Sequence, residues 1–372
     1  MNSLRGKLMR ILVINTVPFM KNGISQMIVN YAINMPKSMK WDVFANEVIS
    51  EDYRENFKRS DLRVIVAPSR KKHPLGYLRL LASTIKSSKY DAIYIHCNSS
   101  MVALDLRFIR LFFHKLIFVH VHGVTTNYPK MEKALRGLMP KSKIVNFAAS
   151  KQAGNWLFHD KKFLVIPNAI NYRQYSFSLS ARKKVRKKLH IGDRQLLVLQ
   201  VGLFNEQKNQ IFSIKLLEKL KDKDNFHFLF VGDGPKKAEV MSSVNKKNLG
   251  RYATFLPASG DMQEIYSGAD VMLFPSIFEP FGMVSIEAQA NGLHVLQSEN
   301  VPDITSIVRG LTTTISLNRP GDWLDAINRS VIRSGNDVDE DLIGRDFSHS
   351  SYDVHSAAKS LVDIMDREVK SH

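Results

Sequence analysis

The chain has 372 residues, which exceeds one ordinary hydrophobic core and fits two domains. Its 44% hydrophobic and 24% charged residues are typical of a folded globular protein, and its single cysteine, Cys97, excludes an intramolecular disulfide framework and indicates a reducing compartment. The net charge of +18 indicates a polyanionic neighbour.

The first segment, MNSLRGKLMRILVIN, places basic residues before a short apolar run, as a signal peptide does. The run passes directly into polar residues without a small-residue cleavage site, so we interpret it as a strand. The sequence contains no stretch of about 18 uncharged apolar residues, the length a membrane-spanning helix needs. We therefore expect a cytoplasmic protein.

Short apolar runs alternate with helical patterns through the first half of the chain. Strands are predicted at 9–14, 41–46, 62–67, 91–96, 116–121 and 144–149. After the first of them, the segment ISQMIVNYAINM predicts a helix whose apolar face consists of Ile24, Met27, Ile28, Tyr31, Ala32 and Met35. This alternation is typical of a parallel sheet covered by helices on both faces.

The alternation stops at the polar and basic segment 171–195, where we place a domain boundary. It then resumes, with strands predicted at 196–201, 226–231, 253–256, 271–274 and 293–297 and helices at 208–220, 235–247, 261–267 and 283–291. The last 20 residues predict a helix with one apolar side, which packs either on its own domain or on the first. The predicted class is α/β with two doubly wound halves. Neither half has a G-x-G-x-x-G turn after its first strand, which removes the main support for a dinucleotide dehydrogenase.

Basic residues gather in RKKH (70–73), LRFIRLFFHKLIF (106–118) and RKKVRKK (182–188). In the second cluster they alternate with large apolar residues, as in segments that lie on an anionic membrane surface. A solvated basic face over a core explains any one cluster equally well. Nucleic acid is the weaker candidate, because the sequence has no recognition motif or aromatic stacking platform of the known kinds. It also has no cluster of Cys and His that predicts a metal site.

The candidate site residues follow the strands, because ligands of open α/β sheets bind outside the carboxyl ends of the strands. Gly23 precedes the first helix, where backbone N–H groups approach a phosphate or sugar, although a simple loop glycine is the alternative. His120 and His122 share one face of their strand, and each is either a ligand-binding or a buried structural histidine. Lys208 stands at a helix start, as a phosphate partner or as a solvated lysine.

The stretch FPSIFEPFGMVSIEAQANG, residues 274–292, has only two charges, Glu279 and Glu287. Gly282 shapes a loop that leaves backbone N–H groups for an anion or sugar hydroxyls at the start of the next helix. Glu287 lies on an apolar face of that helix, where a carboxylate costs several kcal/mol unless it is paired or hydrogen-bonded. The paired hydroxyls of a ribose would satisfy it.

The pattern E-P-F-G-x-V-x-x-E, from Glu279 to Glu287, resembles the signature of family 4 retaining glycosyltransferases of the GT-B fold. The similarity extends over nearly the whole chain and includes KNGIS, HVHG at 120–123, FAAS at 147–150, IPNAINYRQY at 166–175, VGLFNEQKN at 201–209 and VGDGP at 231–235. The second half is particularly similar to bacterial enzymes that build exopolysaccharide or capsule.

The resemblance implies two doubly wound Rossmann-like domains that face each other across a cleft. Residues 1–175 would form the acceptor-side domain, 176–195 a basic linker, and 196–350 the nucleotide-sugar-binding domain. The terminal helix, 351–372, would cross back to the first domain.

The resemblance also implies individual roles. Glu279 would lie by the donor sugar and its phosphate, Lys208 would neutralise the departing diphosphate, and His122 would lie near the reacting centre. Glu287 would hold the ribose. The other donor-binding positions would be Gly23, Ile24, Gly202, Phe281, Gly282, Met283 and Val284. The nucleotide sugar, a UDP-sugar, is a substrate, and the resemblance implies no cofactor, no metal and no covalent nucleophile.

One position departs from the family pattern. The family usually has arginine directly after the glycine of V-G-R, and this chain has Leu203. Losing one cation costs a few kcal/mol of transition-state stabilisation unless another basic residue substitutes.

The predicted function is a metal-independent, retaining hexosyltransferase-type enzyme that transfers a sugar from a UDP-sugar to a growing, lipid-linked glycan of the bacterial surface. It would work in the cytoplasm at the inner face of the plasma membrane. Leu203 motivates the alternative of a noncatalytic partner or glycan-binding subunit. A nucleotide-sugar epimerase of the same fold is a third alternative, less favoured because its residues around the two glutamates would differ. The sequence identifies neither the sugar and base nor the acceptor, the linkage or the oligomeric state.

Overall fold

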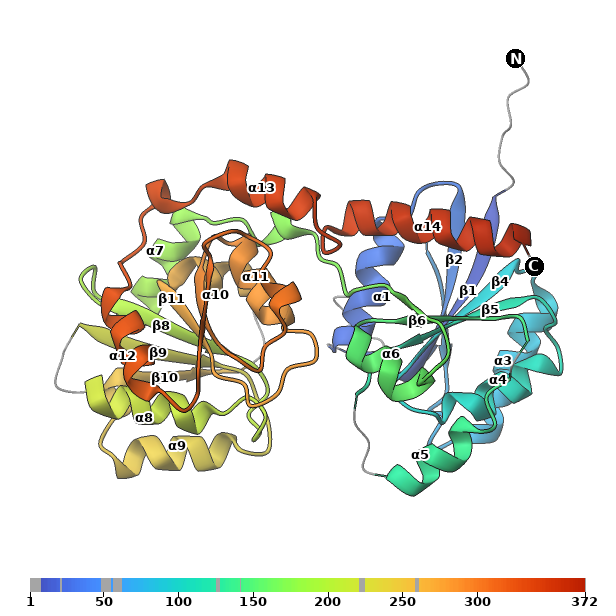
Figure 1. Ribbon diagram of the computed structural model, residues 1–372, viewed down its shortest axis with the longest axis horizontal. Coiled ribbons are helices and arrows are strands. Elements are labelled where there is room, and N and C mark those ends of the chain that lie inside the picture. The colour runs from blue at the N-terminus through green and yellow to red at the C-terminus, as the bar shows by residue number, and fades with distance from the viewer. Residues whose placement is uncertain are drawn as a thin grey trace, which may run out of the picture. The chain divides into compact units, whose positions relative to one another are not determined.

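The computed structural model describes residues 8–20, 22–47, 55, 62–124, 128–140, 142–220, 225–257 and 261–371. The chain divides into two compact units, residues 1–170 with 351–372 (unit 1) and residues 171–350 (unit 2) (Figure 1). Each unit contains one parallel sheet with helices on both faces, so the predicted α/β class with two Rossmann-like halves is confirmed. The basic start of the chain, before Leu8, lies outside the described residues.

The sheet of unit 1 has the strand order β3-β2-β1-β4-β5-β6-β7, and its neighbouring strands are parallel. The central strands are buried on both faces, which explains why they read as nearly continuous apolar runs. Their bounds are β1 Met9–Pro18, β2 Met39–Asn46, β3 Arg63–Ala67, β4 Ala92–Cys97, β5 Leu116–Val121, β6 Ile144–Ala148 and β7 Leu164–Val165. The short edge strand β7 had no sequence signal.

The helices of unit 1 are α1 Gly23–Ile33, α3 Pro74–Ser87, α4 Val102–Arg110, α5 Pro129–Arg136, α6 Lys151–Phe158 and α14 Val354–Ser371. The terminal helix α14 packs beside α1 and buries its apolar side, including Leu361 and Met365, in the core of unit 1 (Figure 1). The backbone N–H of Val354 donates to the carbonyl of Ile170 at 2.9 Å, which attaches the start of α14 to the end of the first segment. Residues 351–372 therefore belong to unit 1.

The sheet of unit 2 has the order β10-β9-β8-β11-β12-β13. The strands are β8 Leu196–Val201, β9 Phe226–Val231, β10 Ala253–Leu256, β11 Val271–Phe274, β12 His294–Ser298 and β13 Thr312–Ile315. The α-helices are α7 Leu179–Lys188, α8 Gln210–Leu220, α9 Lys237–Lys246, α10 Met262–Gly268, α11 Met283–Ala290, α12 Pro320–Arg329 and α13 Glu340–Ser348. The short 3₁₀ helices are η1 Tyr172–Tyr175, η2 Gly250–Tyr252, η3 Asp303–Thr305 and η4 Gly335–Asp337. The edge strand β13 was not predicted, because its TTTI sequence is short and mostly polar.

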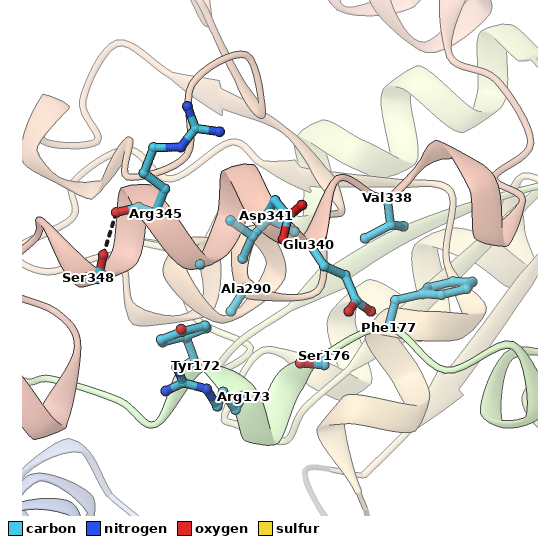
Figure 2. A pocket seen from close by; sticks show the side chains of 12 residues that line it. Tyr172, Arg173, Ser176, Phe177, Ala290, Val338, Glu340, Asp341, Arg345 and Ser348 are labelled. Carbon is cyan, nitrogen blue, oxygen red and sulfur yellow. Dashed lines mark hydrogen bonds between the residues drawn. The ribbon is translucent and has the colours of Figure 1, made fainter.

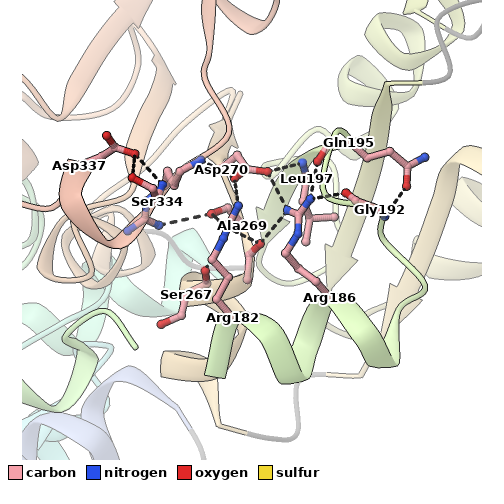
Figure 3. Close-up of polar contacts among 12 residues, drawn as sticks. Arg182, Arg186, Gly192, Gln195, Leu197, Ser267, Ala269, Asp270, Ser334 and Asp337 are labelled. Atoms are coloured by element: carbon pink, nitrogen blue, oxygen red, sulfur yellow. Dashed lines mark hydrogen bonds and ion pairs between the residues drawn. The ribbon is translucent and has the colours of Figure 1, made fainter. Parts of the chain in front are cut away.

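Residues 171–195 are part of unit 2, so the segment 176–195 is not a separate linker. Arg182 and Arg186 of α7 are buried, and each donates to Asp270, at 2.6 and 2.9 Å (Figure 3). The carbonyls of Gly268 and Ala269, at the end of α10, also accept hydrogen bonds from Arg182, so the negative end of a helix dipole helps to balance the second cation. The lysines of the cluster RKKVRKK are therefore exposed, whereas its two arginines are buried and hold α7 to the unit.

Among the described residues, none of the helices has the length and hydropathy that crossing a bilayer requires.

Candidate active site

Lys208 and Glu279 form a buried ion pair at the carboxyl edge of the unit 2 sheet. Lys208 lies in the turn between β8 and α8, and Glu279 lies in the loop between β11 and α11. Lys208 Nζ donates to Glu279 Oε2, and the two side chains are only 14% and 7% exposed. The Lys208 ammonium also lies 4.6 Å from the centre of the Phe274 ring. Two residues that the sequence places far apart are thus brought together in a poorly hydrated position.

Gly282 links this ion pair to the start of α11. Its backbone lies in the left-handed region (φ 68°, ψ 33°), which glycine adopts without strain, and a Cβ there would lie 2.9 Å from Thr305 Cγ2. Its N–H donates to Glu279 Oε1 at 3.2 Å. The first N–H groups of a helix lack intrahelical acceptors, so the half-buried Met283 and Val284 offer hydrogen-bond donors beside the pair. Phe281, also half-buried, precedes this turn.

Gly202 and Leu203 follow β8 on the other side of Lys208. A Cβ at Gly202 would lie 3.3 Å from Lys208 Cδ, and its φ of 149° is one that other residues rarely adopt. The side chain of Leu203 is 53% exposed. The position at which the resemblance expects an arginine therefore projects toward solvent and carries no charge.

Glu287 lies on α11, one turn beyond its start, and is half-buried. Its Oε2 accepts a hydrogen bond of 2.8 Å from the hydroxyl of Tyr266, and the hydroxyl of Tyr175 also hydrogen-bonds the carboxylate. Burial raises the pKa of Glu287 to about 7, although both tyrosines act in the opposite direction. The carboxylate thus has donors from its own chain, which the sequence reasoning missed because they lie on other elements. Its predicted contact with a ribose stays a prediction.

In unit 1, Gly23 and Ile24 form the start of α1. The side chain of Asn22 caps the helix by accepting from Ser25 N at 2.9 Å. Ile24 is a buried core residue, so only its backbone is placed to contact a ligand. A Cβ at Gly23 would lie 3.8 Å from Asn168 Nδ2, which places the Asn168 amide beside this helix start.

His122 directly follows β5, and its N–H donates to the carbonyl of Cys97 at 2.9 Å. Its ring is 5% exposed and stacks on His120, with ring centres 4.2 Å apart, so the two histidines share a face as expected. His122 Nε2 lies 3.0 Å from Nδ1 of His96, at the end of β4. His120 Nδ1 lies 2.6 Å from the hydroxyl of Tyr94.

Burial lowers the pKa of all three histidines, that of His122 to about 3. They are therefore neutral near pH 7, and His122 acts as a hydrogen-bonding group and not as a cation.

The structure also gathers these histidines into a group that the sequence did not predict, because His96 comes from a different strand. Ligand nitrogens of His96, His120 and His122 lie within 4.8 Å of one another, close enough to consider a metal ion. The ring planes are inclined by 27–35° to one another. The three rings are joined by the contact of His96 Nδ1 with His122 Nε2, at 3.0 Å, and by the stacking of His120 on His122.

A pocket of about 620 Å³ lies elsewhere in unit 2, between η1 and α13 (Figure 2). Tyr172 and Arg173 line one side, and Glu340 and Asp341 of α13 line the other. None of the predicted site residues lines this pocket. It is therefore separate from the Lys208–Glu279 pair.

Residues 181–331 match the protein family described as Glycosyl transferases group 1. The chain carries a group 1 glycosyl transferase domain. This group 1 domain includes Lys208, Glu279 and Glu287, whereas Gly23, Ile24 and His122 lie outside the matched residues.

Two named relatives are similar to this domain, and a solved structure is similar in fold. A relative from Bacillus subtilis, named "Putative glycosyltransferase EpsF", is 24% identical over 92% of this chain and 93% of its own length. WclY of Escherichia coli, named as an O-antigen biosynthesis glycosyltransferase, is 26% identical over 46% of the length of this chain and 52% of its own length. HepE of Anabaena, solved with UDP-glucose, superposes with a TM-score of 0.76 at 16% identity and covers 96% of this chain and 100% of its own. At this identity the likeness shows the fold, and the expected GT-B fold is confirmed.

Proposed function

We propose that this chain is a retaining, metal-independent glycosyltransferase of family 4 and hexosyltransferase type, which transfers a sugar from a UDP-sugar to a growing, lipid-linked glycan. The observation that carries the proposal is the buried Lys208–Glu279 pair at the start of α11, within the group 1 domain. Solved structures of HepE contain UDP and UDP-glucose, which supports a UDP-sugar donor. The name of WclY, an O-antigen biosynthesis glycosyltransferase, supports a role in bacterial surface polysaccharide synthesis, and we propose that the product is an exopolysaccharide or a capsule.

The transfer breaks the bond between the anomeric carbon and the diphosphate oxygen, so negative charge develops on the departing UDP. Lys208 Nζ and the N–H groups at the start of α11 are the groups that would stabilise this charge. Glu279 would orient Lys208 and the Gly282 turn, and Glu287 would accept hydrogen bonds from the ribose. Retention by front-face attack needs no covalent nucleophile, and the proposed mechanism assigns none.

The test is a transfer assay with a panel of labelled UDP-sugars and bacterial membrane extract as the acceptor source. We expect label in a lipid-extractable product with the wild-type protein and a loss of at least about 100-fold with Lys208→Met. Lys184→Met is the matched control, because Lys184 pairs with Glu264 at an exposed position of the same unit. Absence of transfer with every donor, together with absence of UDP binding by calorimetry, would overturn the proposal.

We also propose that unit 1 binds an anionic membrane at the inner face of the plasma membrane. Helices α4 and α5 pack together, and Arg107 Nε donates to the carbonyl of Leu138 at 3.0 Å. Leu111, directly after α4, is 67% exposed, Met131 of α5 is 41% exposed, and Lys130 and Lys133 of α5 are exposed as well. Exposed apolar and basic side chains on neighbouring helices are suited to anionic headgroups.

Vesicle flotation tests the membrane proposal. We expect the protein to float with phosphatidylglycerol vesicles and not with phosphatidylcholine vesicles, and Leu111→Glu to weaken flotation. Val331→Glu, at a position 69% exposed in unit 2, is the control. Equal flotation of both variants would contradict the proposed surface.

A noncatalytic glycan-binding or partner subunit is the second candidate, and the uncharged, exposed Leu203 favours it. Calorimetry with UDP-sugars distinguishes the two: micromolar donor binding with slow hydrolysis supports the enzyme, and no binding supports the partner.

A further inference from the structure

His96 contacts the proposed site residue His122 from a neighbouring strand. It lies near the carboxyl end of β4, in register with Asn15 of β1 and His120 of β5, at the centre of the unit 1 sheet. Its side chain is fully buried. The atoms that meet are His96 Nδ1 and His122 Nε2, 3.0 Å apart, and the two rings are inclined by 27° with centres 5.3 Å apart.

The contact between these two neutral rings is a hydrogen bond, so one ring donates a proton from its nitrogen and the other accepts it. A neutral imidazole carries one N–H and one bare nitrogen. If His96 donates, then the proton of His122 must be on Nδ1. If His122 donates, its Nδ1 is bare and His96 carries its own proton on Nε2.

The surroundings of the remaining nitrogens favour donation by His96. His96 Nε2 is buried and has no hydrogen-bond partner among the described residues. An unpaired buried N–H is rarer in proteins than an unpaired buried acceptor, so this nitrogen is better left bare.

His122 Nδ1 and Asn168 Oδ1 are also buried and have no hydrogen-bond partner of good geometry among the described residues. The Asn168 side chain nevertheless raises the pKa of His122, against the larger effect of burial. The same side chain lies beside the start of α1 at Gly23. A proton on His122 Nδ1 would therefore face oxygen acceptors, either the amide of Asn168 or a ligand that displaces it.

We propose that His96 is a positioning residue that donates from Nδ1 to His122 Nε2 and thereby fixes His122 as the Nδ1–H tautomer, which donates a hydrogen bond to a hydroxyl oxygen of the bound sugar. The part that concerns sugar rests on the proposed function, whereas the tautomer does not. His120 is held differently, because its Nδ1 lies 2.6 Å from the hydroxyl of Tyr94.

The first measurement is the nitrogen NMR spectrum of the full-length protein labelled with ¹⁵N-histidine, with the His122 signals assigned by loss in His122→Gln. We expect a protonated Nδ1 and a bare Nε2 in the wild-type protein. In His96→Leu we expect the Nδ1–H signature of His122 to give way to a mixture of tautomers. His96→Asn, whose amide nitrogen takes the place of Nδ1, should restore it.

Tyr94→Phe is the matched control, because it removes one buried hydrogen bond from the same stack without touching a nitrogen of His122. In the transfer assay, His96→Leu should lower kcat/KM about tenfold, the equivalent of one net hydrogen bond, and His96→Asn should recover most of it. Tyr94→Phe should leave kcat/KM within about twofold. UDP affinity, measured by calorimetry, should be unchanged in all three.

A wild-type His122 with its proton on Nε2 would overturn the proposal even if His96→Leu fails to fold. An unchanged tautomer in a folded His96→Leu, or an equal loss in Tyr94→Phe, would do the same. If the wild-type protein transfers no sugar, the proposed function fails, while the spectrum still decides the tautomer.

Discussion

Replacing Lys208 by methionine removes the charge of the buried ion pair and keeps most of the side-chain volume. Glu279 is then left with the N–H of Gly282, at 3.2 Å, and the distant hydroxyl of Ser276, at 3.5 Å, as donors. Breaking a buried pair by removing one partner typically costs about 3–5 kcal/mol, because the other charge stays buried and unpaired. We expect a loss of stability of this order, confined to unit 2.

Glu279→Gln should cost less than Lys208→Met. In Glu279→Gln the ammonium of Lys208 still lies over the Phe274 ring, 4.6 Å from its centre, and such a cation–π contact stabilises a protein by about 0.5–2 kcal/mol. The double variant leaves no unpaired charge, so its stability should return to within about 1 kcal/mol of the wild type. Transfer should not return, because the groups proposed to stabilise the departing UDP are still missing.

Hydrogen exchange of peptides from β8 and β11 measures the opening free energy of unit 2 separately from unit 1. Lys184→Met is the control, and an exposed pair of this kind is worth about 0.2–1 kcal/mol. A double variant whose loss of unfolding free energy equals the sum of the two single losses would refute the claim that an unpaired buried charge causes those losses. Recovery of transfer in the double variant would instead refute the proposed role of the pair.

Three further predictions concern other parts of unit 2. UDP affinity should fall by up to about tenfold per pH unit below pH 7, because burial raises the pKa of Glu287 to about 7 and its protonation removes an acceptor for the ribose. Tyr266→Phe removes a hydrogen bond that favours the ionised carboxylate, so it should move this titration to higher pH. Calorimetry across about pH 5.5–8.5 measures both effects. Leu203→Arg, at an exposed position, should raise kcat without loss of stability if the diphosphate binds beside Gly202, and an unchanged kcat in the transfer assay would contradict this. Asp270→Asn should destabilise unit 2 by about 3–5 kcal/mol, because two buried arginines lose their carboxylate. Asp322→Asn, in an exposed pair, should cost less than about 1 kcal/mol. Denaturant unfolding measures the free energy of unfolding of both variants.

Much of the fold could be predicted because its signals are local. The strands 196–201, 226–231, 253–256 and 271–274 agree with the observed bounds of β8 to β11. Each is a short apolar run, and in β8, β9 and β11 the run reflects burial on both faces, whereas the edge strand β10 is only partly buried. The sequence also predicts a loop shaped by Gly282 before α11, and the structure adds that Gly282 adopts the left-handed conformation there.

The partners of the candidate residues could not be predicted, because they depend on which strand ends meet. The sequence singles out His122, but its hydrogen bond comes from His96 on the neighbouring strand. It likewise predicts a carboxylate at Glu287 that needs donors, but gives no sign that Tyr266 and Tyr175 supply them. Basic clusters mislead for the same reason, since charge composition does not show that Arg182 folds inward onto Asp270.

The two units therefore contribute different kinds of chemistry to the proposed reaction. Burial keeps His122 uncharged, so unit 1 offers it as a hydrogen-bond donor but not as a charge to oppose the departing diphosphate. In unit 2, Leu203 is uncharged as well, so among the predicted site residues of this unit only Lys208 is a cation, beside the start of α11. Lys208 is already paired with Glu279, and it can neutralise a diphosphate only if the pair loosens or the ligand shares the ammonium. A carboxylate close to a departing diphosphate would repel it, so in the proposed reaction the diphosphate would share the Lys208 ammonium while Glu279 keeps its contacts with Lys208 and Gly282.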